Sequence, residues 1–466
     1  MRREFAEGRL WVDRAIVLSS AGAAGLAVVS FTRFTQIADG WFGRVIAWHA
    51  WAALLWVPAL TALVAWLMRR FAPGASGSGI PQVMAALDTR VTPADLPLFV
   101  SLRLALSKFV LTAGAVLAGL SVGREGPSVQ VAAGVMGFAR RWLSPRSGIT
   151  THGLLVAGGA AGIAAAFNTP LGGIVFAIEE LSRTLEQRNS GLITTSIVLG
   201  GLVAVSVFGN NTYFGVLKVQ HLGWHVFWPG VLVVVCAGLS GGLFSRLVAT
   251  SMTPSNHWLD RARRRSPVLF AAGCGVAVAV IGLASGGLTY GGGYQHTRDL
   301  LDGIGSLPLL YVLLKFVSTW LATWTGVPGG IFAPCLAIGA GVGHDVALLT
   351  HSVNAIPLIA LGMAGFLAAV TQAPLTSFII VMEMVDGHAM VLSLMATTMT
   401  ASLLSRMLSR PIYAVLSDLQ LGRLPAQDAV ADAGTGTGAE GRAHGPDSAG
   451  AEAAPAEPSA PPHHVG

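Results

Sequence analysis

The feature of this sequence that most restricts its fold is a succession of long apolar stretches with few charges between them. Several approach the roughly 20 residues that a helix needs to cross a bilayer. Only 11% of the residues are charged, whereas about a quarter are charged in a soluble domain. The sequence therefore predicts an all-α, polytopic membrane protein. The stretches include 46–68, 102–121, 154–178, 193–208, 227–250, 268–285, 307–323, 356–382 and 389–405.

Glycine and proline interrupt several of these stretches, and others are short. Both features are typical of membrane proteins whose helices are tilted or discontinuous. We therefore expect a bundle that is more irregular than a simple series of straight transmembrane helices.

The positive charges lie mainly at the ends of apolar stretches, although the net charge is only +6. Cytoplasmic loops of membrane proteins carry an excess of Lys and Arg. This distribution predicts a multi-pass protein of the cell (inner) membrane with both termini in the cytoplasm, and it argues against nucleic acid as a partner. No cleavable signal is apparent at the start of the chain. The clusters are Arg2–Arg3, Arg69–Arg70, Arg140–Arg141 with Arg146, Arg261–Arg265, and Arg406, Arg410 and Arg423.

Two parts of the chain resemble each other. The sequence AAAFNTPLGGIVFAIEE at 164–180 aligns with AAVTQAPLTSFIIVMEM at 368–384, with Pro170 opposite Pro374 and Glu179 opposite Glu383. Upstream, GREGP at 123–127 has a counterpart in GIFAP at 330–334. Transporters are often built from such repeats, and their sites form where the repeats meet. We expect two transmembrane repeats, 1–220 and 221–424, followed by a polar, disordered cytoplasmic tail over 425–466.

Three short segments place a proline just before an apolar run: GSGIP at 77–81, GREGP at 123–127 and GGIFAP at 329–334. Proline is favoured in the first turn of a helix, so each segment is a candidate helix N-terminus. The free N–H groups and the positive end of the helix dipole can bind an anion there. Any one of them is explained equally well as an ordinary cap. Three in corresponding places favour an anion site made of backbone, to which Ser78 could add a hydroxyl donor.

Lys108, Arg124 and Glu125 are charged residues in strongly apolar surroundings. A charge at the centre of a transmembrane helix costs roughly 2.5 to 3.5 kcal/mol. An internal ion pair that braces the loop would explain Lys108 or Arg124. Glu125 is different, because its carboxylate would lie inside the expected anion site and compete with the ligand.

Glu179 and Glu180 close another apolar stretch. One explanation is an interfacial cap with Arg183 as a partner one turn later. The other is a proton relay, because acids in or at the edge of transmembrane segments often carry protons. The spacing alone leaves both open.

The combination of these motifs resembles the CLC family of chloride channels and chloride/proton antiporters. GSGIP, GREGP and GIFAP occur in the order of the family's three signature motifs, and FNTPLGGIVFAIEE and RPIYAVL also match it. The resemblance covers about residues 10–420. It implies a fold of two inverted-topology repeats, and a homodimer with one pore in each subunit.

The resemblance also implies roles for individual residues. Glu125 would be the gating glutamate that competes with chloride, and Glu180 would transfer protons on the internal side. The hydroxyls of Ser78 and Tyr413 and the amides of Ile331 and Phe332 would hold the central anion. The full set of expected chloride-binding residues is Ser78, Gly79, Ile80, Gly123, Arg124, Gly126, Ile331, Phe332 and Tyr413.

The sequence therefore favours a secondary active transporter that exchanges chloride for protons. A passive chloride channel on the same fold is the alternative, and Glu180 argues against it. An ATP-driven pump would need a phosphate-binding loop, and none of the three lysines follows a glycine. An intramembrane enzyme would need a nucleophile with its base or a metal cluster. The histidines are scattered and Cys236, Cys274 and Cys335 lack metal spacing, so we expect no enzyme activity, cofactor or metal.

Overall fold

The computed structural model describes residues 8–424 except 146, 183–189, 210–211 and 216–223. These residues form helices and connecting turns, and within them the backbone pairing of Gly123 with Gly330 is an isolated bridge outside any strand. Eight helices in this part of the chain are long and apolar enough to cross a membrane. The expected all-α, multi-pass architecture is confirmed. The expected tail at 425–466 and Arg183 lie outside the described residues.

The helices that precede residue 210 run from α2 to α10. Their bounds are α2 (Gly8–Trp48), α3 (Ala53–Phe71), α4 (Ile80–Ala86), α5 (Leu96–Phe99), α6 (Leu102–Leu117), α7 (Glu125–Phe138), α8 (Thr151–Phe167), α9 (Pro170–Phe176) and α10 (Ser190–Phe208). Single turns occur at Ala50–Ala52, Pro73–Ala75, Ala139–Trp142 and, as a π turn, Ala177–Leu181.

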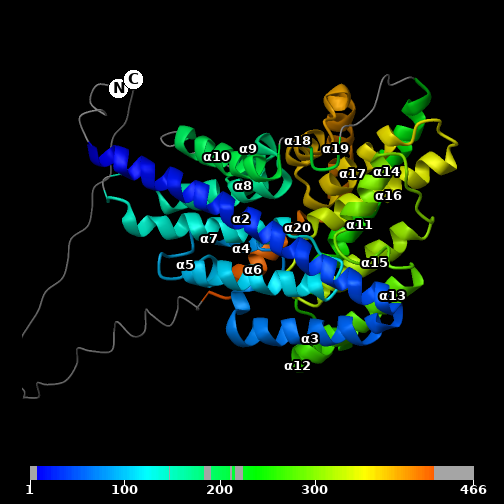
Figure 1. The fold of residues 1–466 in the computed structure, drawn as a ribbon, viewed down its shortest axis with the longest axis horizontal. Helices are drawn as coiled ribbons and strands as arrows, with labels where there is room; N and C mark the ends of the chain where they lie inside the picture. The colour runs from blue at the N-terminus through cyan, green and yellow to red at the C-terminus, as the bar shows by residue number, and fades with distance from the viewer. Residues whose placement is uncertain (1–7, 146, 183–189, 210–211, 216–223, 425–466) are drawn as a thin grey trace, which may run out of the picture. The chain divides into compact units, whose positions relative to one another are not determined.

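The helices that follow residue 223 run from α11 to α20. Their bounds are α11 (Phe227–Met252), α12 (Trp258–Arg265), α13 (Pro267–Ala284), α14 (Tyr294–Leu301), α15 (Tyr311–Trp324), α16 (Phe332–Leu349), α17 (Ile356–Thr371), α18 (Pro374–Met384), α19 (Val391–Arg406) and α20 (Ile412–Leu421). In Figure 1, α6, α7, α8 and α10 lie together on one side and α11 and α14 to α17 on the other, and α2 crosses the view toward α13. Helix α20 contacts α4, α11 and α17 and so links the two groups.

The two similar sequence segments, 164–180 and 368–384, are interrupted in the same way. The apolar stretch 154–178 breaks between α8 and α9, and 356–382 breaks between α17 and α18. At each break a non-glycine residue adopts the left-handed conformation, Asn168 with φ 59° and Gln372 with φ 59°. Pro170 and Pro374 then start the next helix, as proline does at the first helical position. The expectation of discontinuous helices is confirmed at these two places.

Close helix packing depends on glycine at equivalent interfaces. α7 packs against α8 and α16 against α17, the two most extensive helix pairs. A Cβ atom on Gly158 would lie 2.8 Å from the carbonyl oxygen of Ala132, and one on Gly162 would lie 2.6 Å from that of Ser128. Gly339 and Gly362 approach each other in the same way in the second half. Small residues allow membrane helices to pack backbone to backbone, and this holds the starts of α7 and α16 in place.

The apolar stretches did not predict every spanning helix. Gly8–Trp48 forms one helix of 41 residues, most of which precedes the first apolar stretch named from the sequence. The stretch 46–68 contains the end of that helix and a turn before α3 begins at Ala53. The charged residues Asp13, Arg14, Arg33 and Asp39 divide the apolar run of α2, and Asp13 is buried where it accepts a hydrogen bond of 3.0 Å from the amide of Ser144.

Candidate anion site and proton path

The three glycine and proline motifs converge at the centre of the described chain. α4 begins at Ile80, α7 at Glu125 and α16 at Phe332, as expected for three helix N-termini. Gly123 and Gly330 exchange two backbone hydrogen bonds of 2.7 Å each. Gly77 similarly pairs with the third motif and the turn before it, donating to the carbonyl oxygen of Gly326 at 3.2 Å and accepting from the amide of Gly329 at 3.1 Å. These contacts fix the starts of the helices against one another.

Two hydroxyl groups at this centre have no hydrogen-bond partner among the described residues. They belong to Ser78 and Tyr413, whose residues are only 7% and 1% exposed. The two hydroxyls are close enough to interact with each other, but their geometry is not that of a regular hydrogen bond. A buried hydroxyl without a partner is costly, so an acceptor such as an anion would be stabilised between them. The ring of Tyr413 stacks on that of Phe332 with a centroid distance of 6.1 Å.

Main-chain atoms of the glycine and proline motifs surround the two hydroxyls. The Cα atom of Gly126 faces the Ser78 hydroxyl so closely that a methyl group on it would collide with that oxygen. Gly79, with φ 106°, directs the chain into α4 and packs against the carbonyl oxygen of Gly126. Ile80 and Ile331 are buried beside them. Of the nine residues expected to bind chloride, the structure brings eight to this centre, whereas the Arg124 side chain donates to the hydroxyl of Tyr213 in a different cavity. The roles of all nine stay predictions.

The Glu125 side chain is directed at the starts of α7 and α16. The amides nearest its carboxylate are those of Arg124, Glu125 and Ala333. One oxygen lies over Gly123, where a Cβ atom would collide with it. That oxygen is buried and has no hydrogen-bond partner within the described chain. The carboxylate thus occupies a position in which helix N-termini favour negative charge.

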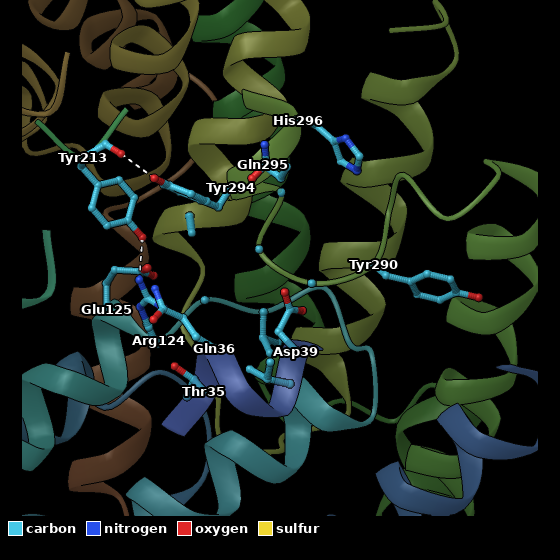
Figure 2. A pocket seen from close by; sticks show the side chains of 17 residues that line it. Thr35, Gln36, Asp39, Arg124, Glu125, Tyr213, Tyr290, Tyr294, Gln295 and His296 are labelled. Carbon is cyan, nitrogen blue, oxygen red and sulfur yellow. Dashed lines mark hydrogen bonds between the residues drawn. The ribbon is translucent and has the colours of Figure 1, made fainter. Parts of the chain in front are cut away.

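Glu125 separates two cavities. The outer cavity, of about 240 Å³, is lined by Gly123, Arg124 and Glu125 together with side chains of α2 and the 290–296 segment. Figure 2 shows its wall, with Arg124 donating a hydrogen bond of 3.1 Å to the hydroxyl of Tyr213. The inner cavity, of about 300 Å³, is lined by Ser78, Ile331 and Tyr413. The anion site therefore has an approach from either side, with Glu125 between them.

Three arginines line the inner cavity: Arg69, Arg263 and Arg423. Arg263 donates to the carbonyl oxygen of Ser251 at 2.9 Å, and Arg423 donates to the hydroxyl of Ser76 at 3.3 Å. A cavity lined by one sign of charge concentrates ions of the opposite sign. The sequence indicated these arginines only as marks of the cytoplasmic side, because their convergence depends on tertiary structure.

Glu180 lies in a third cavity of about 330 Å³, which does not include the anion-site residues. Other titratable side chains in its lining are Asp88, His152 and Asp418. Arg90 donates to Asp88 with N–O distances of 2.8 and 3.0 Å, and these hydrogen bonds lower the pKa of the Asp88 carboxyl. Glu180 and Glu125 are both close enough to act electrostatically on the hydroxyl of Tyr413.

Glu179 has a different environment from its neighbour. Its carboxylate accepts hydrogen bonds from the amides of Leu375 at 3.1 Å and Thr376 at 2.6 Å, in the first turn of α18. Glu383 accepts from the amides of Leu171 and Gly172, in the first turn of α9, at 3.2 and 2.7 Å. Glu179 therefore caps the start of α18, a role different from the interfacial cap with Arg183 that the sequence left open.

Lys108 forms no ion pair with a described residue; its partners are backbone carbonyl oxygens. The ammonium group donates to the carbonyl oxygens of Ala75 at 2.9 Å and Gly77 at 2.6 Å. It therefore braces the loop that carries Ser78 without a carboxylate. Lys315 does the same for another loop, donating to the carbonyl oxygens of Thr289 at 2.9 Å and Gly291 at 2.7 Å. Sequence reasoning missed Lys315, although it precedes Gly330 by the same spacing as Lys108 precedes Gly123.

Comparisons with known proteins agree with this architecture. The family model described as voltage gated chloride channel matches residues 60–406. The chain is 30% identical over 440 residues to the H(+)/Cl(-) exchange transporter ClcA of Citrobacter koseri, covering 89% of this chain and 91% of the relative. It is 32% identical over 424 residues to ClcA of Vibrio parahaemolyticus, with 86% and 88% covered.

Solved structures share the fold. A slow cyanobacterial Cl-/H+ antiporter superposes with a TM-score of 0.76 at 23% identity, covering 88% of this chain and 98% of that one. A CLC-type fluoride/proton antiporter superposes with a TM-score of 0.70 at 20% identity, covering 87% and 98%. The match to the family model and the length of the similarity to ClcA are decisive: this chain belongs to the CLC family, the family of voltage-gated chloride channels.

Proposed function

We propose that this protein is a secondary active transporter that exchanges chloride for protons across the cell membrane. The observation that carries the proposal is the place of Glu125, whose carboxylate lies among helix N-termini between an outer and an inner cavity. A group in that position blocks anion passage when it is ionised. The relatives named as H(+)/Cl(-) exchange transporters support the proposal.

In this mechanism chloride binds on the inner-cavity side of Glu125. The unpartnered hydroxyls of Ser78 and Tyr413 donate to it, and the first amides of α16, near Ile331 and Phe332, face it. Arg69, Arg263 and Arg423 attract chloride into the inner cavity. The hydroxyls and amides that hold the ion carry no full charge. This suits a site that must also release chloride.

Proton binding to Glu125 removes its negative charge, and with it the attraction of the helix N-termini. The side chain then leaves its position and chloride enters. Protons reach Glu125 from the internal side through Glu180, whose cavity is separate from that of chloride. Chloride and protons thus use separate internal routes that meet at the Glu125 carboxylate. Their movements are coupled because the same position cannot hold both a chloride ion and the ionised Glu125 side chain.

The arrangement in the membrane is part of the proposal. Arg69, Arg263 and Arg423 lie around one cavity, which supports placing these loops, and with them both termini, on the cytoplasmic side of an inner membrane. We expect a homodimer with one pore in each subunit. Neither the termini nor a partner subunit is among the described residues. Light scattering of the purified protein, corrected for bound detergent, measures the subunit number.

One experiment tests the function. Purified protein in liposomes is given a chloride gradient, and chloride efflux and internal pH are recorded together. Uphill proton movement driven by chloride supports the antiporter. Chloride flux with no proton movement would establish the passive channel instead, and an absence of both would reject the proposal.

A further inference from the structure

A second carboxylate borders the outer cavity. Asp39 projects from α2 into the space that Glu125 and Arg124 line from the start of α7 (Figure 2). Thr35 and Gln36 line the same space. Spacings of three and four residues place these side chains on one face of the helix. α2 therefore presents a polar stripe to the outer cavity, and Asp39 is its charged end.

No hydrogen bond or ion pair to a described residue accounts for the presence of Asp39 at this position. Its side chain opens onto the outer cavity, and no described residue donates a hydrogen bond to it or forms an ion pair with it within 4 Å. Its carboxylate lies over Gly291, whose Cβ atom would be 3.2 Å from the nearer oxygen. Lys315 is close, but its ammonium group is occupied by the carbonyl oxygens of Thr289, Tyr290 and Gly291.

A carboxylate at this place works against chloride, because it repels anions from the cavity that leads to the site. The charged groups that face it from neighbouring elements are Arg124 and Lys315. Burial favours the neutral form of the Asp39 carboxyl, and these two positive charges oppose that effect. Burial and the charge of Lys315 lower the pKa of His296 in the same cavity, so that imidazole is neutral in alkaline solution. Three tyrosines, Tyr213, Tyr290 and Tyr294, complete the titratable lining.

We propose that Asp39 is the outer proton-transfer residue, which passes protons between Glu125 and the external solution through the water of the outer cavity. The inference rests on the proposed exchange of chloride for protons. When protonated Glu125 turns outward, its proton moves through cavity water to the Asp39 carboxylate and then to bulk water. In the reverse direction ionised Asp39 takes a proton from outside and supplies it to Glu125.

This role predicts a dependence on pH. In acid, hydronium is abundant and reaches Glu125 directly, so Asp39 adds little. In alkaline solution hydronium is scarce, His296 is neutral and the relay limits the rate. A positioned proton-transfer group typically contributes at least about a hundredfold, and because the direct water route stays open here we expect a loss of about tenfold without it.

The test compares Asp39→Asn with the unmodified protein in liposomes that have the same pH on both sides, so that the orientation of the inserted molecules does not affect the pH at either face. We expect chloride-driven proton movement to fall about tenfold at alkaline pH and to change little in acid. Asp39→Glu should restore most of the rate. The matched control is Asp299→Asn, which removes a charge from α14 at a residue that does not line the cavity.

The Glu125→Ala background separates a proton role from a chloride role. There, chloride flux no longer requires protonation, so adding Asp39→Asn should leave it unchanged. The inference would be overturned if Asp39→Asn lowered chloride flux equally in both backgrounds, or if it lowered proton movement by the same factor at every pH. Either result would leave the exchange mechanism intact. If the unmodified protein moves no protons, the proposed function fails and Asp39 has no proton to pass. Asp39→Ser serves as a second neutral variant, and chloride flux in the Glu125→Ala background verifies that each protein is folded.

Discussion

Gly123 and Gly330 hold each other through two backbone hydrogen bonds of 2.7 Å, each donating to the carbonyl oxygen of the other. They occupy equivalent places in the two similar parts of the chain, one opening GREGP and the other preceding IFAP. The pairing joins the N-terminus of α7, which carries Glu125, to that of α16, which begins at Phe332. The position of the gating carboxylate relative to the anion site is thus set by main-chain bonds.

Ser78→Pro should shift anion selectivity from chloride toward nitrate. The substitution removes a hydroxyl that has no partner within the described chain and that suits a small, strongly hydrated halide. A hydrogen bond to a charged group contributes about 1.5 to 3 kcal/mol, so the chloride preference should fall roughly tenfold or more. Relative chloride and nitrate fluxes in liposomes measure this. Unchanged selectivity would remove Ser78 from the site.

Glu180→Gln should abolish proton movement while chloride transport persists, because the amide keeps the shape of the side chain but cannot ionise. The neighbouring substitution Glu179→Gln is the control. It alters a carboxylate that caps α18 and should leave proton movement in place. Simultaneous chloride and pH recordings distinguish the two. Uphill proton transport by the Glu180→Gln protein would leave Glu180 with an interfacial role only.

Lys108→Met should lower stability and weaken chloride binding together. Its ammonium group donates to the carbonyl oxygens of the loop before Ser78, and each buried carbonyl left without a donor costs about 1 to 3 kcal/mol. Arg103→Met, an exposed substitution on the same helix, is the control. Thermal unfolding in detergent and chloride-binding calorimetry provide the measurements. A stable Lys108→Met protein with normal chloride affinity would show that the loop does not depend on this brace.

Glu179→Ala and Glu383→Ala should destabilise the protein by similar amounts, because each removes the carboxylate cap of a helix in the other half. Loss of an N-cap typically costs about 0.5 to 2 kcal/mol. Each variant should therefore unfold at a lower temperature. A large effect of one and none of the other would mean that the two caps are not equivalent.

Sequence reasoning located the parts of this molecule that depend on local chemistry. Pro170 and Pro374 predicted the interrupted helices, and the three glycine and proline motifs predicted the helix N-termini that meet at the anion site. Both depend on the properties of one residue type within a few positions. The similar spacing of the motifs in two parts of the chain predicted an internal repeat.

The contacts that assemble the site could not be predicted in this way. Lys108 binds carbonyl oxygens 31 to 33 residues away, and Glu179 binds amides 196 and 197 residues away. Their partners are backbone groups, which every residue has, so no side-chain type marks them. Asp39 was missed for a different reason: no motif marks it in the sequence, and its place beside Glu125 depends on how α2 packs against the start of α7.

Glu125→Ala tests the central claim most directly, because that claim assigns both gating and proton carriage to one carboxylate. Chloride and proton fluxes are recorded together in liposomes at two pH values, with the unmodified protein in parallel. We predict chloride transport with no proton movement and with much weaker pH dependence than in the unmodified protein, and anion density where the carboxylate had been. A Glu125→Ala protein that still drives protons uphill would contradict the mechanism and leave Glu125 as a structural partner of Arg124.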